Sequence, residues 1–251
     1  PEVRDGFDVS CVQLIAHTGS ACPPDVKREM INWFGPVLLE SYGGSETGTL
    51  CRITSSEWLE HPGSVGRTVE PFAVIVVDEA GNELAIGETG ILAFQAPVGF
   101  GPSYHQDPEK TAKAYVRPGA FTLGDMGHID EEGFIFITDR LSDMVVSGGV
   151  NLYPSESENV LREHPGVTEV AIIGIPSTDL GEQLLAFVVL ANPLDPPSAE
   201  GLQYFCRERL AAYKIPRRFE YIEELPRNEM QKVDKKLLRR PYWDGDRNIA
   251  G

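Results

Sequence analysis

Residues 12–48, VQLIAHTGSACPPDVKREMINWFGPVLLESYGGSETG, decide the fold class. An apolar run over 12–16 predicts a strand, and Pro23-Pro24-Asp25 after it is typical of a helix start. Gly35-Pro36 predicts the end of that helix, and residues 37–39 predict a second buried strand. This strand–helix–strand order favours a parallel sheet of the α/β class. The apolar face expected for the helix consists of Val26, Met30, Ile31 and Phe34.

The composition excludes several classes of protein. With 251 residues, of which 41% are hydrophobic, the chain can bury the core of one large or two smaller domains. No apolar run approaches the ~18 residues that a membrane span needs. The net charge of −16 argues against a general binder of nucleic acids or anionic membranes. Four scattered cysteines without a CxxC pair predict reduced thiols and a cytoplasmic location rather than a zinc site.

The pattern of predicted strands, helices and glycines divides the chain into three segments. Residues 1–62 alternate strand and helix, and residues 63–139 are rich in glycine and short strands, which predicts a small antiparallel barrel. Residues 140–251 mix helices and strands again, which predicts a small α+β domain. In that last segment we expect helices over 154–162, 198–210 and 233–240 and strands over 167–175, 184–190 and 219–222.

A glycine-rich stretch, Ser41–Gly48, directly follows the second predicted strand. Loops at the carboxyl ends of parallel strands are where α/β sheets bind ligands. Its glycines would let a ligand approach the backbone, Tyr42 could stack on a planar ring, and Ser45 offers a hydroxyl. Glu46 offers a hard oxygen for Mg²⁺. Taken alone, such a stretch is more often a plain turn than a binding site.

Four further places carry groups suited to binding or catalysis, and each has a structural alternative. Asp125 could accept hydrogen bonds from sugar hydroxyls or fix its own turn. Asp139-Arg140 could meet phosphate or ribose or form an ion pair between domains. The loop Ser147-Gly148-Gly149 could admit a ligand or only turn the chain, and Lys232 lies in a polar loop, where most lysines are merely solvated.

The order of these motifs resembles that of the adenylate-forming, or AMP-binding, superfamily, from about Leu14 to Lys236. This superfamily includes acyl-CoA synthetases, aryl-CoA ligases, firefly luciferase and the adenylation domains of peptide synthetases. The motifs that carry the resemblance are Gly19-Ser20-Ala21, Tyr42-Gly43-Gly44-Ser45-Glu46, Gly87-Glu88-Thr89-Gly90 with Tyr104 and 107–111 behind it, Phe121–Asp125, Asp139–Met144, Ser147–Pro154 and Pro226–Lys232.

The resemblance implies a two-step reaction in which a carboxylate and Mg·ATP give an acyl-adenylate, and coenzyme A then displaces AMP. Between the steps, the C-terminal domain would rotate about a hinge near Ser142. Lys232 would be the catalytic lysine and Glu46 would hold Mg²⁺. The residues implied to bind nucleotide are Gly19, Ser20, Ala21, Tyr42, Gly43, Ser45, Asp125 and Arg140, and those implied to line the path of coenzyme A are Ser147, Gly148 and Gly149.

The sequence also departs from the family pattern. Ser45 and Leu123 each replace a threonine, Ser142 replaces the usual Asp or Lys of the hinge, and Gln231 replaces the glycine before the catalytic lysine. The larger departure is that no Ser/Thr/Gly-rich phosphate loop precedes Gly19. We therefore expect this chain to be the C-terminal half of a synthetase and not to catalyse adenylation by itself.

Three functions agree with the sequence. The favoured one is an AMP-forming acyl-CoA synthetase that acts on a small-molecule carboxylic acid, ATP and coenzyme A. A peptide-synthetase adenylation domain is the second, although the loop at 147–151 speaks against it. The third is a non-catalytic module that binds nucleotide or coenzyme A, which has no need of Lys232. The identity of the acid cannot be derived, because only the stretch Tyr42–Gly48 and His17 are expected to border it.

Overall fold

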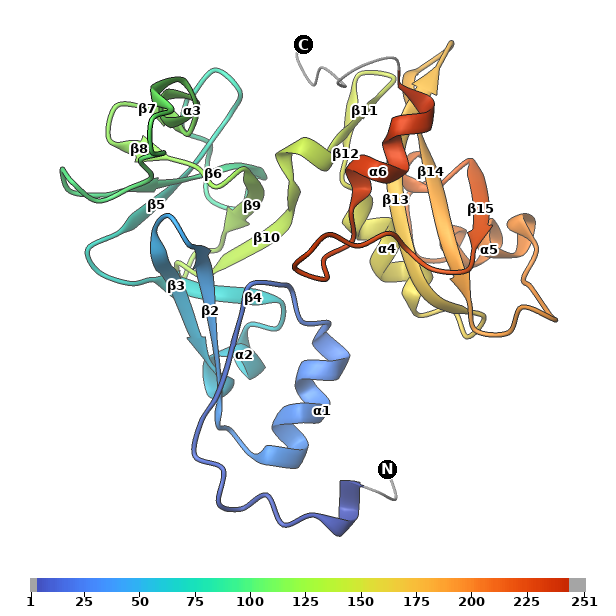
Figure 1. The fold of residues 1–251 in the computed structure, drawn as a ribbon, viewed down its shortest axis with the longest axis horizontal. Coiled ribbons are helices and arrows are strands. Elements are labelled where there is room, and N and C mark those ends of the chain that lie inside the picture. Colours follow the sequence, from blue (N-terminus) through green and yellow to red (C-terminus); the bar gives the residue numbers. More distant parts are fainter. Residues whose placement is uncertain (1–3, 244–251) are drawn as a thin grey trace. The chain divides into compact units, whose positions relative to one another are not determined.

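The computed structural model describes residues 4–243 and divides the chain into two compact units, residues 1–137 and 138–251 (Figure 1). Each unit has its own sheet and its own hydrophobic core. Within the first unit, the strands before and after residue 62 belong to one continuous sheet. The division of that unit into segments 1–62 and 63–139 therefore stays an interpretation of the sequence.

The first unit opens with η1 (Arg4–Gly6), β1 (Ile15–Thr18), α1 (Pro24–Phe34) and β2 (Leu38–Gly44). Strands β1 and β2 pair in parallel, with His17 opposite Glu40 and Thr18 opposite Ser41, which confirms the predicted parallel pair. The first strand begins at Ile15 rather than at residue 12. Helix α1 ends at Gly35, whose φ of +83° is a conformation that favours glycine.

The buried side of α1 agrees with the predicted one except at Val26. Val26 is 45% exposed, whereas Lys27 is buried at 2% exposure. The ammonium group of Lys27 pairs with Glu40 of β2 and lies 4.8 Å from the centroid of the Trp58 ring. A buried charge is tolerated only with such a partner, and apolar periodicity along one helix does not reveal a partner on a strand.

The remaining strands of the first unit pair antiparallel, which was predicted for residues 63–139 but not for the strand at 48–54. The order in the sheet is β1-β2-β3-β4-β10-β9-β6-β8-β7, with β5 beside β6. A capping box between Thr54 and Glu57 begins α2, and Asp107 caps α3. The elements are β3 (Gly48–Thr54), α2 (Ser55–Glu60), β4 (Ser64–Thr68), β5 (Ala73–Val77), β6 (Gly90–Gln95), α3 (Pro108–Lys113), β7 (Tyr115–Arg117), β8 (Ala120–Phe121), β9 (Asp125–Ile129) and β10 (Ile135–Arg140).

The second unit is built on a five-stranded sheet with the order β12-β11-β14-β13 and with β15 beside β14. Strands β13 and β14 form a long antiparallel hairpin, and β15 is parallel to β14. The elements are η2 (Leu141–Asp143), β11 (Val145–Ser147), β12 (Val150–Leu152), α4 (Pro154–Arg162), β13 (Val167–Ser177), β14 (Gly181–Leu190), α5 (Ala199–Arg207), η3 (Ala212–Lys214), β15 (Arg218–Ile222), α6 (Lys235–Arg239) and η4 (Arg240–Tyr242).

Helices cover both faces of this second sheet (Figure 1). Ile172 of β13 packs in one cluster with Leu161 of α4 and Leu202 of α5. Its neighbour Ile173 packs in the opposite cluster with Leu238 of α6. Successive side chains of a strand point to opposite faces, so one apolar run supplies both cores.

The predicted helix over 154–162 and the cap at Ser198 are confirmed, since Gly201 donates its backbone N–H to the Ser198 hydroxyl at 3.1 Å. Two predicted helices are shorter than expected. Helix α5 ends at Arg207, and α6 begins only at Lys235, because Asp234 accepts the N–H groups of the first turn. Within the described part of the chain, no helix is long and apolar enough to cross a membrane.

Candidate functional site

The carboxyl ends of β1 and β2 bring two predicted segments together. Thr18, at the end of β1, donates its hydroxyl hydrogen to the backbone oxygen of Ser41 on β2 at 2.8 Å. Gly19, Ser20 and Ala21 follow directly and are exposed. Gly19 has a φ of +85°, and a Cβ placed on it would meet no atom within 4 Å. The turn therefore needs its glycine for backbone conformation and has open space beside it.

The sequence suggested that the glycine-rich stretch forms a loop after the second strand. In the structure, most of this stretch belongs to strands instead. Residues Tyr42, Gly43 and Gly44 continue β2 into a hairpin with β3, and only 45–47 form the turn. A Cβ on Gly43 would lie 1.9 Å from the backbone oxygen of Gly48. This glycine is therefore required by the close approach of the two strands, whatever else passes beside it.

Tyr42 and Asp125, two residues predicted to bind the nucleotide, are in direct contact. The hydroxyl group of Tyr42 donates a hydrogen bond of 2.5 Å to Oδ2 of Asp125. Asp125 begins β9 and is buried, with 5% exposure. The Tyr42 ring packs against Phe94, with 5.9 Å between the ring centroids. The core of the unit thus fixes both side chains at the edge where Gly19 lies.

Glu46 carries the carboxylate predicted to hold Mg²⁺. Its Oε2 atom accepts a hydrogen bond of 3.2 Å from the hydroxyl of Ser45. Partial burial, and then the charge of Glu46 and a hydrogen bond to it, raise the pKa of Tyr104 above its usual value. Among the described residues no cluster of three or more His, Cys, Asp or Glu side chains could hold a metal. A single carboxylate fits Mg²⁺, which usually takes one or two carboxylates together with waters and substrate phosphates.

The segment predicted to be a hinge is tied to the second unit by polar contacts. Asp139 accepts hydrogen bonds from the backbone N–H groups of Arg140 and Ser155, each at 2.8 Å. Ser142 lies in the short helix η2, and the next residue, Asp143, pairs with Arg239 of α6. The role of Ser142 as a hinge remains a prediction.

Lys235, which is close in sequence to the predicted catalytic lysine, is bound within a charged cluster. Its ammonium group lies 2.7 Å from Oε1 of Glu158 and 4.0 Å from Oδ2 of Asp143. Burial by itself would lower the pKa of Lys235, but the nearby carboxylates of Glu158, Asp139 and Asp143 outweigh it and raise this pKa. Lys235 is therefore a charged structural residue of the second unit.

The loop at 147–149 turns the chain between β11 and β12. Gly148 and Gly149 have φ values of +58° and +80°, which two-residue hairpin turns require. The backbone N–H of Gly148 also donates to the oxygen of Leu180 at 2.8 Å. The glycines are explained by the turn, and a path for coenzyme A along them remains a prediction.

Lys232 lies on an ordered loop rather than on a loose one. Arg227 and Val233 form an isolated antiparallel bridge, and Asn228 donates its backbone N–H to the oxygen of Lys232 at 2.8 Å. Oδ1 of Asn228 accepts the backbone N–H of Lys232 at 3.1 Å. Gln231 has a φ of +62°, so the residue that replaces the family's glycine keeps a conformation that favours glycine. Among the described residues, Lys232 is hydrogen-bonded through its backbone, and its ammonium group has no ion pair or hydrogen bond.

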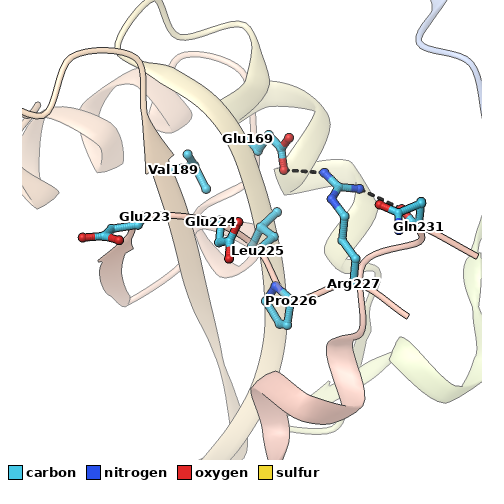
Figure 2. Close-up of a pocket in the computed structure, with 8 residues that line it drawn as sticks. All are labelled: Glu169, Val189, Glu223, Glu224, Leu225, Pro226, Arg227 and Gln231. Carbon is cyan, nitrogen blue, oxygen red and sulfur yellow. Dashed lines mark hydrogen bonds and ion pairs between the residues drawn. The ribbon is translucent and has the colours of Figure 1, made fainter. Parts of the chain in front are cut away.

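A pocket of about 360 Å³ lies beside this loop. Figure 2 shows Arg227 at its edge, with its guanidinium group between the carboxylate of Glu169 and the backbone oxygen of Gln231. This contact could not be predicted from the sequence, because Glu169 lies on β13, far from the loop along the chain. The pocket is lined by Glu169, Val189, Glu223, Glu224, Leu225, Pro226, Arg227 and Gln231.

The predicted site residues therefore fall into two groups. Those of the first unit are at or near the ends of β1 and β2, joined by the contacts Thr18–Ser41, Tyr42–Asp125 and Ser45–Glu46. Arg140 and Lys232 belong to the second unit, as do Ser142 and the glycine loop.

Comparison with known proteins shows which family the chain matches. Residues 3–104 match the AMP-binding enzyme family, and residues 156–232 match the C-terminal domain of AMP-binding enzymes. The chain is 37% identical over 243 residues to a 2-succinylbenzoate–CoA ligase of Geobacillus kaustophilus, covering 91% of this chain and 49% of that protein. It is 37% identical over 234 residues to a long-chain-fatty-acid–CoA ligase of Salmonella typhi, covering 93% of this chain and 41% of that protein.

A solved structure agrees with these relatives. The o-succinylbenzoate CoA synthetase of Bacillus subtilis, in complex with its acyl-adenylate intermediate, superposes with a TM-score of 0.82 at 31% identity, covering 91% of this chain and 46% of that one. The chain belongs to the AMP-binding enzyme family, and its fold is that of an adenylate-forming enzyme. It spans about half the length of the curated relatives it matches.

Proposed function

We propose that this chain supplies the adenine edge, the magnesium carboxylate and the catalytic lysine of an AMP-forming acid–thiol ligase that makes acyl-CoA from a carboxylic acid. The observation that carries the proposal is the contact of Tyr42 with Asp125 beside the Gly19 turn, because separate motifs meet there at one sheet edge. The ligase names of the relatives support the same reaction class.

In the first step, a carboxylate oxygen attacks the α-phosphorus of ATP, and the bond to the β-phosphate breaks to release pyrophosphate. In the second step, the sulfur of coenzyme A attacks the acyl carbon and AMP leaves. We infer that the Gly19 turn and Tyr42 bind adenine, Asp125 accepts ribose hydroxyls and Ser45 meets the α-phosphate. Magnesium held by Glu46 would neutralise phosphate charge when bound.

Lys232 is proposed to stabilise charge that develops on the α-phosphate and carboxylate oxygens during adenylation. Its ammonium group is free of partners in the described chain, and its loop is ordered, so little reorganisation would be needed when the reaction occurs. Arg140, at the end of β10, would bind ribose or phosphate. A purely binding module would have no use for such a lysine.

The test uses carboxylate-dependent ATP–pyrophosphate exchange with short, long and aromatic acids. It compares the 251-residue chain with an extended protein, in which this chain follows the phosphate-loop segment that family members carry ahead of the adenine turn. We expect exchange from the extended protein and none from the chain alone. No exchange by the extended protein with any acid would contradict the proposed ligase.

The thiol that accepts the acyl group distinguishes the two catalytic functions that agree with the sequence. After adenylation, an acyl-CoA ligase transfers the acyl group to free coenzyme A, whereas a peptide-synthetase adenylation domain transfers it to a carrier-protein thiol. We expect thioester formation with free coenzyme A. Transfer only to a carrier protein would favour the second reading.

A further inference from the structure

The Lys232 loop is fixed to the sheet of the second unit by one guanidinium group. Arg227 donates one hydrogen bond from Nη1 to the backbone oxygen of Gln231 at 2.9 Å and one from Nη2 to Oε2 of Glu169 at 2.7 Å. Glu169 lies on β13, opposite Val189 of β14, in the long antiparallel hairpin of the sheet. The planar fork of arginine suits two acceptors held at a fixed angle (Figure 2).

The acceptor on the loop is the carbonyl group that joins Gln231 to Lys232. Gln231 adopts a φ of +62°, which side-chain-bearing residues rarely take, so this tip conformation needs support from its surroundings. The support on one side is Asn228, whose Oδ1 accepts the N–H of Lys232. On the other side it is Arg227, which holds the peptide oxygen.

We propose that Glu169 and Arg227 form a clamp that positions Lys232 for adenylation by holding the Gln231–Lys232 peptide. This proposal rests on the proposed role of Lys232 as the catalytic lysine. Both side chains of the clamp are more than a third exposed, at 37% for Arg227 and 40% for Glu169. An exposed pair contributes little to overall stability, so its removal should loosen the loop without unfolding the unit.

The first readout does not depend on activity. In the 251-residue chain, hydrogen exchange of the Lys232 amide reports the order of the loop, because that N–H is bonded to Asn228. We expect Arg227→Ala to speed its exchange by about tenfold or more while the β13 amides keep their protection. Glu169→Gln, which keeps an oxygen acceptor but loses the charge, should have a smaller effect. Unchanged exchange at Lys232 in both variants would overturn the clamp.

The second readout separates the two half-reactions in the extended protein. We expect Arg227→Ala to lower the rate of adenylation by about 10- to 100-fold, since small misplacements of a catalytic group cost that much. Arg227→Lys should recover only part of the loss, because one ammonium cannot present the same fork. Transfer from preformed acyl-adenylate to coenzyme A should change less than about twofold, since the proposed role of Lys232 belongs to the first step.

Arg218→Ala is the matched control, because Arg218 and Glu220 form another Arg–Glu pair in the same unit, with side chains 54% and 30% exposed. This variant should leave the Lys232 amide and both half-reactions unchanged. A clamp variant that slows both half-reactions equally, or neither, overturns the clamp while leaving the ligase proposal standing. If the unsubstituted extended protein shows no adenylation, the ligase proposal fails, and the hydrogen exchange alone decides whether the clamp orders the loop.

Discussion

Tyr42 and Asp125 are joined by a hydrogen bond of 2.5 Å although 83 residues separate them in the sequence. One residue lies on β2 and the other begins β9, and these strands are not neighbours in the sheet. The bond therefore holds two distant strands of the first unit at the edge proposed to bind the nucleotide. It also provides a first test of how this edge is stabilised.

Tyr42→Phe removes the donor to a buried carboxylate. We expect the variant to lower the free energy of unfolding of the first unit by about 1–3 kcal/mol, because the buried carboxylate of Asp125 then loses the hydrogen bond from Tyr42. Urea denaturation of the 251-residue chain measures the change. Tyr204→Phe, at a tyrosine 62% exposed on α5, is the control and should change nothing measurable. Equal midpoints for both variants would show that the bond contributes no net stability.

Breaking the buried pair of Lys27 and Glu40 should destabilise the first unit strongly, whereas replacing both residues by apolar ones should change its stability much less. Their side chains are 3% and 10% exposed. We expect Lys27→Met alone to destabilise the first unit by about 3–5 kcal/mol, because the buried Glu40 loses its ammonium partner and keeps only His17, 3.9 Å away. Lys27→Met with Glu40→Leu should recover most of that loss.

The control for this pair is Lys113→Met with Glu109→Leu, which removes an exposed pair on α3 at 74% and 80% exposure. That double variant should change stability by about 0.5 kcal/mol or less. A Lys27→Met variant as stable as the unsubstituted chain would contradict the account of α1.

Gln231→Gly should stabilise the second unit. Gln231 has a φ of +62°, where a side chain costs about 1–2 kcal/mol, and glycine gives back about half of this through unfolded-state entropy. The expected gain is about 0.5–1 kcal/mol in urea denaturation. Gln231→Ala keeps a Cβ atom and should show no gain, so a stabilising alanine would point to the side chain rather than to the backbone.

The thiols should differ sharply in reactivity. Burial raises the pKa of Cys51 to about 12 and that of Cys206 to about 11, whereas Cys11 is exposed. With a disulfide reagent at pH 8, Cys11 should react fast, and Cys51 and Cys206 only after unfolding. Cys11→Ser should abolish the fast phase. Rapid labelling of Cys51 in the folded chain would contradict its burial.

The same two thiols predict how stability changes at alkaline pH. In the unfolded chain they ionise near the ordinary pKa of 9.0, while in the folded chain they stay protonated. The unfolded state then binds fewer protons, so stability falls as the pH rises above about 9. Cys206→Ala should make this fall less steep in urea denaturation between pH 8 and pH 10.

Local signals predicted the elements that local chemistry determines. The helix over 154–162 and the cap at Ser198 follow from residues within a few positions of each other. The continuation of β2 through Tyr42 and Gly43 was missed, because the glycines serve an approach to Gly48 that only the paired strand reveals. Val26 was assigned to the buried face of α1 because it is apolar. Lys27 is buried in its place, and this could not be predicted because the partner of Lys27 lies on another element.

The candidate site shows the same limit. The order of motifs predicted Tyr42, Asp125 and Lys232, since each lies in a recognisable stretch of sequence. It could not predict the Tyr42–Asp125 bond or the Glu169–Arg227 pair, because long-range contacts leave no trace in a single sequence. The turn at Gly148 and Gly149 was one of two alternatives that the sequence left open, because such glycines are as typical of a binding loop as of a turn, and the strands β11 and β12 on either side were not predicted.

The central claim is that Lys232 acts in adenylation and not in thioester formation. The most direct test is Lys232→Ala in the extended protein, with both half-reactions measured and Lys236→Ala, at an exposed lysine of α6, as the control. The account predicts that Lys232→Ala loses carboxylate-dependent ATP–pyrophosphate exchange and keeps transfer from preformed acyl-adenylate to coenzyme A, while Lys236→Ala keeps both. Full exchange by Lys232→Ala would contradict the account.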